Sequence, residues 1–370
     1  MEDNFQFCDE LGPEKIINVY QPDLNLRGIL VVDNTAAGPA IGGCRLASDV
    51  STRECFRLAR AMTLKNAAAG LPHGGGKSVI FADPHMPVSE KQQIVRAFAR
   101  SLEDIREYII GPDMGTNEQA MAWCHDEIGR AVGLPAEIGG IPLDEIGATG
   151  FGVAIAAEVV QGFCDLKLQG ARVVVQGFGS VGSHAARFLA ERGAVLVGAS
   201  DSRGGTVNPG GLDVESLIAF KAAGNSVHAF AEGNAVDADA MVAVPCDIWI
   251  PAARPDVLNA DNVERLTAKV IIQGANIPAT AEAERIMFER GVINVPDFIA
   301  NAGGVISAAV EYAGGTRSEA FQVIEEKIRH NTDIVLSDAH NLAVPEREAA
   351  NQMAEQRVRK AMSLRRWHRD

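Results

Sequence analysis

The feature that most constrains the fold is a run of apolar and small residues at 171–182, ARVVVQGFGSVG. An apolar strand here leads directly into the spacing G-x-G-x-x-G, which opens the helical segment SVGSHAARFLAER. In such a unit the first glycine makes a tight turn, the second lets the backbone approach a pyrophosphate, and the third lets helix and strand pack closely. We therefore predict a dinucleotide-binding turn with Gly177, Gly179 and Gly182 in these roles.

Asp201 lies nineteen residues after Gly182, at the end of the next predicted strand. A ribose-binding carboxylate is expected at this distance, so the strand, the helix and the acid together favour nucleotide binding over glycines that serve packing alone. Ser202 and Arg203 follow directly and could accommodate the 2′-phosphate of NADP, which Asp201 would repel. We expect NAD as the cofactor, with NADP as the alternative.

Strands and helices alternate after residue 171. Strands separated by helical segments favour a parallel sheet covered on both faces. Before this region, glycine and proline break the periodicity at 138–152, which we interpret as the approach to a domain junction, with Thr149 capping a long apolar helix through Val160. The predicted strands are 171–176, 194–199, 226–229, 247–250, 270–273 and 292–295, and the helix after the glycine turn is 180–192.

Capping residues mark the helices of the first 150 residues. Ser51 and Glu54 form a capping box, and Gly70 ends the same helix. Ser89 is the expected N-cap of an amphipathic helix. The elements expected here are strands at 26–32 and 76–81, helices at 51–69 and 89–106, and a helix opened by Thr116 and Gln119.

A length of 370 residues favours two domains over one. We predict an α/β protein with its domain junction near residues 138–152 and a nucleotide-binding parallel sheet after it. The charged helical segment at 319–364 is expected to pack back on the first domain.

Two lysines lie twelve positions apart in MTLKNAAAGLPHGGGKSVIF, at 62–81, on either side of a glycine-rich turn. A glycine run lets a ligand approach the backbone. Lys77, at this turn and near the second ammonium of Lys65, would have a lowered pKa and could act as a base. Alternatively, Lys65 only complements a helix dipole, Lys77 is solvated, and Asp113 in GPDMGT is a helix cap. Together with the dinucleotide turn, two amines and one acid suggest nicotinamide redox chemistry on an anionic, amine-bearing substrate.

Composition excludes several other classes of function. A net charge of −14 opposes binding to nucleic acid or to an anionic membrane. We expect no signal peptide, because the N-terminus is acidic and lacks an apolar core, and no spanning segment. The six cysteines are scattered, which favours reduced thiols in the cytoplasm, and the eight histidines lack metal-site spacing, so no metal is expected.

Four blocks resemble the glutamate/leucine/phenylalanine/valine dehydrogenase superfamily: MTLKNAAAGLPHGGGKSVIFADP, GPDMGTNEQAMAW, GFGSVG and QGAN…VPDFIANAGGV. The first block is similar to the leucine-dehydrogenase branch, and the second and last are more similar to glutamate dehydrogenase. The resemblance implies a substrate-binding and oligomerisation domain with a mixed sheet at 1–145, completed by 335–370. It also implies a Rossmann NAD(P)-binding domain at 146–334, with a cleft between the two domains. It also implies a homo-oligomer that interconverts an L-amino acid with its 2-oxo acid and ammonia.

The same resemblance assigns roles to individual residues. Lys65 would bind the substrate α-carboxylate, Lys77 would activate water, and Asp113 would relay protons at the amino nitrogen. Gly42 and Gly43 would approach the substrate carboxylate. Asn276, which could equally be a turn residue, would face the nicotinamide side of the cleft. The full set of expected cofactor contacts is Gly177, Gly179, Ser180, Val181, Gly182, Asp201, Ser202, Arg203, Ala252, Asn276 and Asn301.

Two positions bear on the substrate side chain. Glutamate dehydrogenases carry a lysine where this chain has Ile41 in GPAIGGCR, and a serine where it has Ala308. Without either group, a bound glutamate γ-carboxylate would stay unpaired, which costs several kcal/mol. We therefore expect an apolar L-amino acid as the substrate.

Three alternatives remain open at the level of the sequence. The first is a glutamate dehydrogenase or a dehydrogenase of an unusual 2-amino acid. The second is a non-catalytic NAD-binding regulator, which the presence of Lys77 and Asp113 disfavours. The third is a 2-hydroxy-acid dehydrogenase, which would need a His/Arg pair rather than two lysines.

Overall fold

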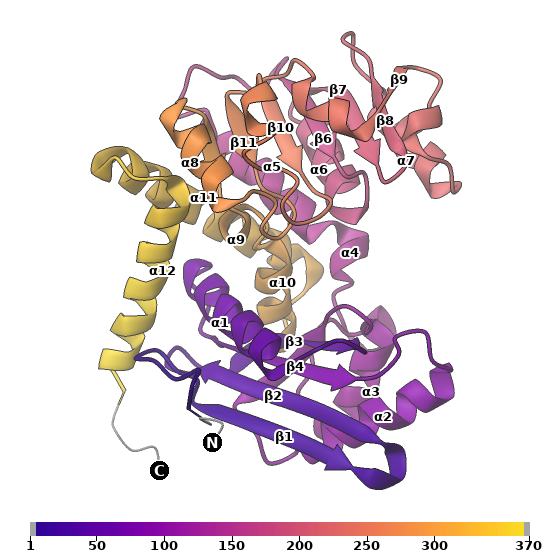
Figure 1. Ribbon diagram of the computed structural model, residues 1–370, viewed down its shortest axis with the longest axis vertical. Helices are drawn as coiled ribbons and strands as arrows, with labels where there is room; N and C mark the ends of the chain where they lie inside the picture. Colours follow the sequence, from indigo (N-terminus) through magenta and orange to yellow (C-terminus); the bar gives the residue numbers. More distant parts are fainter. Residues whose placement is uncertain (1–4, 366–370) are drawn as a thin grey trace. The chain divides into compact units, whose positions relative to one another are not determined.

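The computed structural model describes residues 5–365, and its contacts divide this part of the chain into two compact units (Figure 1). The first unit comprises residues 5–142, 305–320 and 351–365, and the second comprises 143–304 and 321–350. Two segments lie in a different unit from the one expected. Residues 305–320 belong to the first unit rather than the second, and residues 335–350 belong to the second rather than the first. Glu311 accepts hydrogen bonds from the backbone amides of Leu134 (3.1 Å) and Ile141 (2.7 Å), which ties 305–320 to the first unit. The division into 1–145 with 335–370, and 146–334, stays a prediction.

The first unit contains a five-stranded mixed sheet. Its two antiparallel pairs join β1 to β2 and β2 to β4, whereas β3 runs parallel to both β4 and β5. The strand order is β1 (Lys15–Gln21), β2 (Leu26–Asn34), β4 (Gly74–Phe81), β3 (Ala40–Ala47) and β5 (Tyr108–Pro112).

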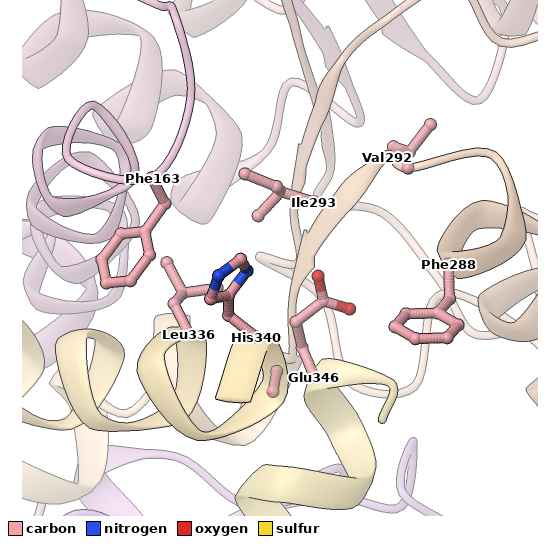
Figure 2. A pocket seen from close by; sticks show the side chains of 9 residues that line it. Phe163, Phe288, Val292, Ile293, Leu336, His340 and Glu346 are labelled. Carbon is pink, nitrogen blue, oxygen red and sulfur yellow. The ribbon is translucent and has the colours of Figure 1, made fainter. Parts of the chain in front are cut away.

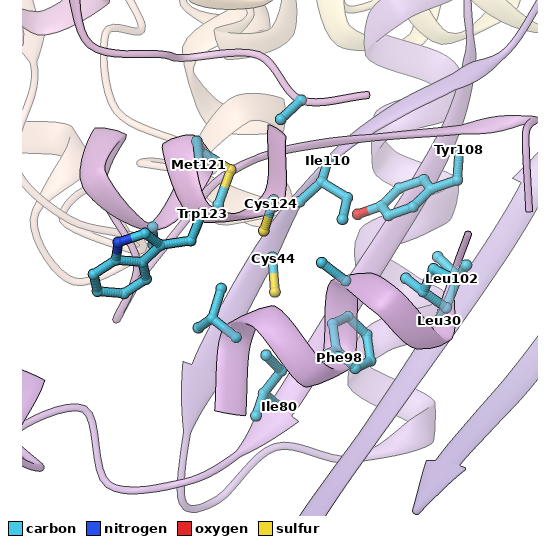
Figure 3. Close-up of a cluster of buried hydrophobic side chains, with 14 of the residues drawn as sticks. Leu30, Cys44, Ile80, Phe98, Leu102, Tyr108, Ile110, Met121, Trp123 and Cys124 are labelled. Atoms are coloured by element: carbon cyan, nitrogen blue, oxygen red, sulfur yellow. The ribbon is translucent and has the colours of Figure 1, made fainter. Parts of the chain in front are cut away.

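Helices cover both faces of this sheet, which explains why β2 is apolar along most of its length. Leu30 packs in a cluster with residues of α2 (Val88–Ser101) and α3 (Glu118–Ile128), including Phe98 and Met121 (Figure 3). Val31 points the other way and packs against Cys55 of α1 (Thr52–Ala68). Because successive side chains of a strand point to opposite faces, a strand buried on both sides needs apolar residues at every position.

Helix α1 begins as predicted, whereas the caps of three other helices differ. The Ser51 side chain accepts a hydrogen bond from the Glu54 amide (3.1 Å). Helix α2 begins after Pro87 rather than with Ser89 as its cap, and α3 is capped by Asn117 rather than Thr116. Helix α5 (Ala148–Val160) begins after Gly147, in a left-handed conformation (φ 71°), rather than at Thr149. Predicting N-caps from side-chain type alone misplaced each of these three caps by one or two residues. The conformation of the preceding backbone also decides where a helix can begin.

The second unit contains a seven-stranded sheet. The strands from β12 to β7 run parallel, and β8 and β9 are added antiparallel at one edge. The order is β12 (Ile293–Val295), β11 (Val270–Ile272), β10 (Ile248–Pro251), β6 (Arg172–Gln176), β7 (Val195–Asp201), β8 (Gly204–Val207) and β9 (Asn234–Val236). The expected α/β class, with one mixed and one Rossmann-type sheet, is confirmed.

The strand predicted at 226–229 is wrong. Residues Val227–Ala229 form a 3₁₀ turn, because the Ser226 hydroxyl and the Val227 amide both donate to the Asp201 carboxylate (2.8 and 3.1 Å) and hold the segment out of the sheet. The remaining helices are α4 (Leu143–Ile146), α6 (Ser180–Ala190), α7 (Val214–Ala222), α8 (Ala281–Glu289), α9 (Asp297–Ala300), α10 (Gly303–Tyr312), α11 (Arg317–Leu342) and α12 (Glu346–Ser363).

The C-terminal part of α12 belongs to the first unit. Arg357 donates Nη1 to the carbonyl oxygens of Ala67 (3.2 Å) and Ala68 (2.6 Å), at the end of α1. A cation at this position satisfies carbonyls that a helix C-terminus leaves unpaired. Within residues 5–365, no helix combines the length and the apolar character needed to cross a membrane.

Candidate active site

Lys77 lies in β4 directly after three glycines, and only 5% of its surface is exposed. A side chain at Gly75 would collide with the backbone of Thr63 in α1, and one at Gly76 would lie 2.9 Å from the Tyr108 ring. We expected the glycine run to admit a ligand, but the structure fills these positions with protein atoms. Gly75 therefore lets α1 lie against the strand, whereas Gly74 and Gly76 make room for Asn34 and Tyr108. This close packing buries Lys77.

The Lys77 ammonium donates to Oδ2 of Asp113, which follows the end of β5. Burial, followed by the positive charge of Arg45, lowers the pKa of Lys77 to about 8, and the charge of Lys65 adds to this effect. The neighbouring carboxylate acts in the opposite direction by favouring the ammonium form. A buried lysine with this pKa exists partly as a free amine near neutral pH, which a proton-transferring group requires.

Gly43 of β3 is needed for Asp113 to occupy this position. A Cβ at residue 43 would lie 2.8 Å from Cβ of Asp113 and 2.7 Å from the Pro112 carbonyl oxygen. A Cβ at Gly42 would collide with the Gly76 carbonyl oxygen of β4. Both positions thus require glycine because three strands approach each other closely there. The expected role of these glycines toward the substrate carboxylate stays a prediction.

Three other expected substrate contacts, Lys65, Ile41 and Ala308, also belong to the first unit. Lys65 lies in the last turn of α1. Ile41 of β3 and Ala308 of α10 are both buried, with 3% and 6% of their surfaces exposed. The first unit therefore contains Lys65, Lys77, Asp113 and the two uncharged positions, whereas Asn276 belongs to the second unit.

The predicted nucleotide turn connects β6 to α6 in the second unit. Gly177 has a φ of 97°, and a Cβ there would lie 2.6 Å from that of Ala253. A Cβ at Gly182 would collide with the Gly177 carbonyl oxygen, whereas one at Gly179, the N-cap of α6, would meet nothing within 4 Å. The first and third glycines thus serve the turn and the packing, and the second leaves open space at a helix N-terminus. This arrangement fits a dinucleotide pyrophosphate.

Ser180 and Val181 begin α6 at this turn, and Ser180 lies near an acidic side chain. Its hydroxyl donates weakly to the carbonyl and carboxylate oxygens of Asp144 (3.3 and 3.4 Å). The Asp144 side chain is exposed.

Asp201 ends β7 as predicted, but its carboxylate is already surrounded by donors. It accepts from Lys221 Nζ (2.6 Å), the Ser226 hydroxyl (2.8 Å) and the Arg203 amide (2.9 Å). Burial raises the pKa of Asp201, but Lys221 and the other donors outweigh burial and bring it down to about 2. Ser202 and Arg203 are exposed in the tight turn from β7 to β8.

The remaining expected cofactor contacts lie on loops that follow the carboxyl ends of β10 and β11 and on the segment around α9. Ala252 follows β10 and donates its amide to the Gln176 carbonyl (2.7 Å). Asn301 donates Nδ2 to Oδ1 of Asn276 (3.0 Å) and to the Gly274 carbonyl (3.3 Å). These hydrogen bonds bring the two asparagines together, in the crevice region where parallel sheets bind ligands.

Two family descriptions match most of the chain. Residues 13–130 match the "Glu/Leu/Phe/Val dehydrogenase, dimerisation domain", and residues 139–366 match "Glutamate/Leucine/Phenylalanine/Valine dehydrogenase". The chain belongs to this dehydrogenase family. It is an NAD(P)-dependent amino acid dehydrogenase, so the class of enzyme expected from the sequence is confirmed.

Individual relatives of the dehydrogenase are named for glutamate. It is 38% identical to a glutamate dehydrogenase of Aeropyrum pernix, over 90% of this chain and 85% of that protein. It is 37% identical to an NADP-specific glutamate dehydrogenase of Saccharolobus shibatae, over 90% and 83%. A hetero-hexameric glutamate dehydrogenase of Thermus thermophilus, in its Leu-bound form, superposes with a TM-score of 0.84 at 28% identity, covering 96% of this chain and 91% of that one. The expected preference for an apolar substrate is not confirmed, and the alternative of glutamate fits these names better.

One residue of the candidate site, Arg45, was missed in the sequence analysis. Its Nε donates to Oδ1 of Asp113 (3.1 Å), and its Nη1 donates to Glu54 Oε1 (2.5 Å). The Met114 amide also donates to Oδ1 (2.5 Å), so this oxygen is held while Oδ2 faces Lys77. A signal was present, because Arg45 is two residues from Gly43 on the same strand and therefore points to the same face.

A second missed residue, Lys221, comes from α7 and could not be related to Asp201 by any local pattern. The Lys221 ammonium compensates the negative charge of the Asp201 carboxylate. We expected that charge to repel the 2′-phosphate of NADP. Within residues 5–365, no group of three or more histidine, cysteine, aspartate or glutamate side chains is arranged to hold a metal ion.

Proposed function

We propose that the dehydrogenase catalyses the reversible oxidative deamination of an L-amino acid, with Lys77 and Asp113 as its proton-transferring pair. The observation that supports this proposal best is the buried Lys77 ammonium facing one carboxylate oxygen of Asp113, while Arg45 and a backbone amide hold the other. Two groups that exchange a proton must be within hydrogen-bond reach in a fixed orientation, and this pair satisfies both requirements.

Lys65 supports the proposal as the anchor of the substrate α-carboxylate. It is close enough to Lys77 for its charge to lower the Lys77 pKa, so both ammonium groups act on the same region. The two ammonium groups repel each other, and an anionic group of the substrate would attract both of them. Binding through Lys65 would place the amino nitrogen of the substrate toward Asp113 and Lys77.

In the deamination direction, a nicotinamide nucleotide supplies the hydride acceptor. Hydride can leave Cα only when the amino nitrogen is uncharged, so we propose that Asp113 accepts a proton from the substrate ammonium. Loss of the Cα hydride then leaves an iminium ion, which must add water. Neutral Lys77 would remove one proton from this water as its oxygen attacks the imino carbon, and Asp113 would return its proton to the nitrogen of the resulting carbinolamine. The C–N bond would then break as the carbinolamine hydroxyl gives its proton to the Asp113 carboxylate, so that ammonia leaves and the carbonyl group forms. The products are the 2-oxo acid, ammonia and the reduced nucleotide.

For the substrate side chain, glutamate is the better-supported candidate, because the close relatives carry that name. A second candidate, an apolar amino acid, is supported by Ile41 and Ala308, which are buried and uncharged. A glutamate γ-carboxylate beside these two residues would stay unpaired, at a cost of several kcal/mol. The two candidates thus predict opposite orders of catalytic efficiency.

A panel of 2-oxo acids with ammonia, followed by the absorbance of the reduced nucleotide, tests both candidates. Turnover of 2-oxoglutarate at least about tenfold more efficient than that of the leucine, valine and phenylalanine oxo acids supports glutamate. The reverse order supports the apolar candidate, since a few buried methylenes are worth roughly 1–3 kcal/mol. Turnover that does not depend on ammonia with any oxo acid would refute oxidative deamination altogether.

For the cofactor, we propose that the dehydrogenase favours NAD but admits NADP. Asp201 stays ionised and disfavours a 2′-phosphate, whereas Lys221 compensates that charge and exposed Arg203 offers another cation. Comparing KM for the two nucleotides tests this proposal, and a lower KM for NADP would refute it. A homo-oligomeric state and a cytoplasmic location also stay predictions, and light scattering checks the first.

A further inference from the structure

A cavity of about 170 Å³ lies in the second unit, apart from every residue assigned to catalysis or to the nucleotide. Figure 2 shows side chains of α11, α12, β12 and the segment after α5 directed into it. Most of the lining is apolar, and two polar side chains, His340 and Glu346, interrupt it. The largest apolar side chains of the lining are Phe163, Phe288, Val292, Ile293 and Leu336.

Glu346 is the unusual member of this lining, because only 8% of its surface is exposed. Its Oε1 accepts a long hydrogen bond from the Asn294 amide (3.3 Å). No lysine or arginine of residues 5–365 lies within ion-pair distance of it in the structure. Arg347, the next residue in the sequence, forms ion pairs with Glu284 (2.7 Å) and Asp297 (2.9 Å) instead.

A buried carboxylate without a cationic partner is unfavourable, and it either takes up a proton or gains a counter-ion. Burial, with a further contribution from the charge of Glu284, raises the pKa of Glu346 to about 7. At neutral pH the carboxyl group is therefore balanced between its two forms. A cation that enters the cavity would stabilise the ionised form.

We propose that this cavity binds a small organic ammonium ion, a primary amine with a compact alkyl body, through the Glu346 carboxylate. The volume suits such a ligand, because an apolar cavity of about 150 Å³ in another protein holds benzene. The apolar walls would bury the alkyl body, and the ammonium group would donate to Glu346. A free amino acid fits less well, since its own carboxylate would approach Glu346 and the cation of Arg347 is already paired.

Isothermal titration calorimetry of the full-length protein with isoamylamine tests the proposal, with isoamyl alcohol as an uncharged probe of the same shape. We expect the amine to bind and the alcohol to bind at least about tenfold more weakly, because hydrogen bonds to charged groups are the stronger ones. Equal binding of the two probes would mean that the cavity recognises shape alone, which would overturn the proposal. So would the absence of amine binding at millimolar concentrations at pH 8.

Variants locate the bound amine. Glu346→Gln should weaken binding at least about tenfold, whereas the matched control Glu348→Gln, an exposed glutamate on the same helix turn, should change it less than about twofold. Ala339→Leu, which fills part of the cavity without changing charge, should also weaken binding. Loss of binding in Asp113→Asn but not in Glu346→Gln would place the amine at the catalytic pair and refute this site.

The pH dependence gives a test that needs no variant. The groups that act on Glu346 are His340 from α11, Glu284 from α8, the Asn294 amide from β12 and its own backbone amide. Arg347, the next residue of its helix, pairs with Glu284 and Asp297 instead. Since the amine stays charged, binding should follow ionisation of Glu346 and be about tenfold tighter at pH 8 than at pH 6. Affinity that does not change over this range would contradict recognition by Glu346.

Discussion

Replacing Arg45 by methionine tests whether this residue both positions Asp113 and keeps the Lys77 pKa low. Methionine retains much of the apolar stem but removes the charge and the donor to Oδ1 of Asp113. A hydrogen bond to a charged group contributes roughly 1.5–3 kcal/mol, so its loss should lower kcat/KM by about ten- to a hundredfold. The variant should fold, because Arg45 is partly exposed at the end of β3.

The pH profile of the Arg45→Met variant gives the sharper result. Arg45 is the second cause, after burial, of the lowered pKa of Lys77. Removing its charge should raise that pKa from about 8, by roughly one unit or less, since burial persists. Because neutral Lys77 is the active form in deamination, the rise of kcat/KM with pH should move to higher pH. The loss of activity should then be larger at pH 7 than at pH 10.

Two further variants separate the effects. Arg45→Lys keeps a positive charge near Lys77 but changes the donor geometry, so it should lose activity with little displacement of the profile. Arg57→Met, which removes an exposed arginine from α1, should leave both activity and profile unchanged. If Arg45→Met keeps kcat/KM within about threefold at pH 7 and the same pH midpoint, Arg45 does not act through Asp113 and Lys77.

Four other perturbations have definite expected outcomes. Lys77→Ala should still bind NADH but lose at least about a thousandfold in kcat, within the range that general acid–base groups contribute, and a loss below tenfold would rule out its proposed role. Asp201→Ser should narrow the difference in KM between NAD and NADP, and an unchanged difference would mean that Asp201 takes no part in cofactor choice. The pKa of Glu346 in the folded protein is about 7, above its ordinary value, because ionising this buried carboxyl group destabilises the fold. Its contribution to the free energy of unfolding is therefore fully present at low pH and is lost as pH rises through 7. Glu346→Gln, which cannot ionise, should therefore melt at a higher temperature than the wild type at pH 8 but not at pH 4, and calorimetry that shows no such crossover would contradict a buried charge. Ile41→Lys should reduce turnover of apolar substrates if Ile41 lines the side-chain pocket, and unchanged ratios of kcat/KM across the substrate panel would show that it does not.

Local sequence patterns determined much of this protein. The strand, the three glycines and the helix that form the nucleotide turn are contiguous, so their spacing alone predicted the turn. The alternation of strands and helices after residue 171 predicted the parallel sheet. The Ser51 cap at the start of α1 is similarly local, and its hydrogen bond from the Glu54 amide formed as expected. The long matching blocks predicted the family and the class of reaction, which the comparisons confirmed.

Other features depended on residues distant in the sequence. The pairing of Lys77 with Asp113, and the hydrogen bond from Arg45 to Asp113, require β4, β3 and β5 to lie side by side in one register. The glycines before Lys77 were expected to face a ligand, but they face α1 and Tyr108, because close packing of a helix on a strand removes space for side chains. Only the assembled sheet shows which neighbour fills each of these positions.

The same distinction holds in the second unit. Asp201 was placed correctly at the end of its strand, yet its partner Lys221 comes from a later helix. Glu346 has nothing unusual in its local sequence, and it became notable only when α11, α12 and β12 enclosed it without a cation. Motifs are short because a turn or a cap is decided by neighbours along the chain. Burial, charge pairing and pKa are decided by neighbours in space, and only the tertiary structure brings these together.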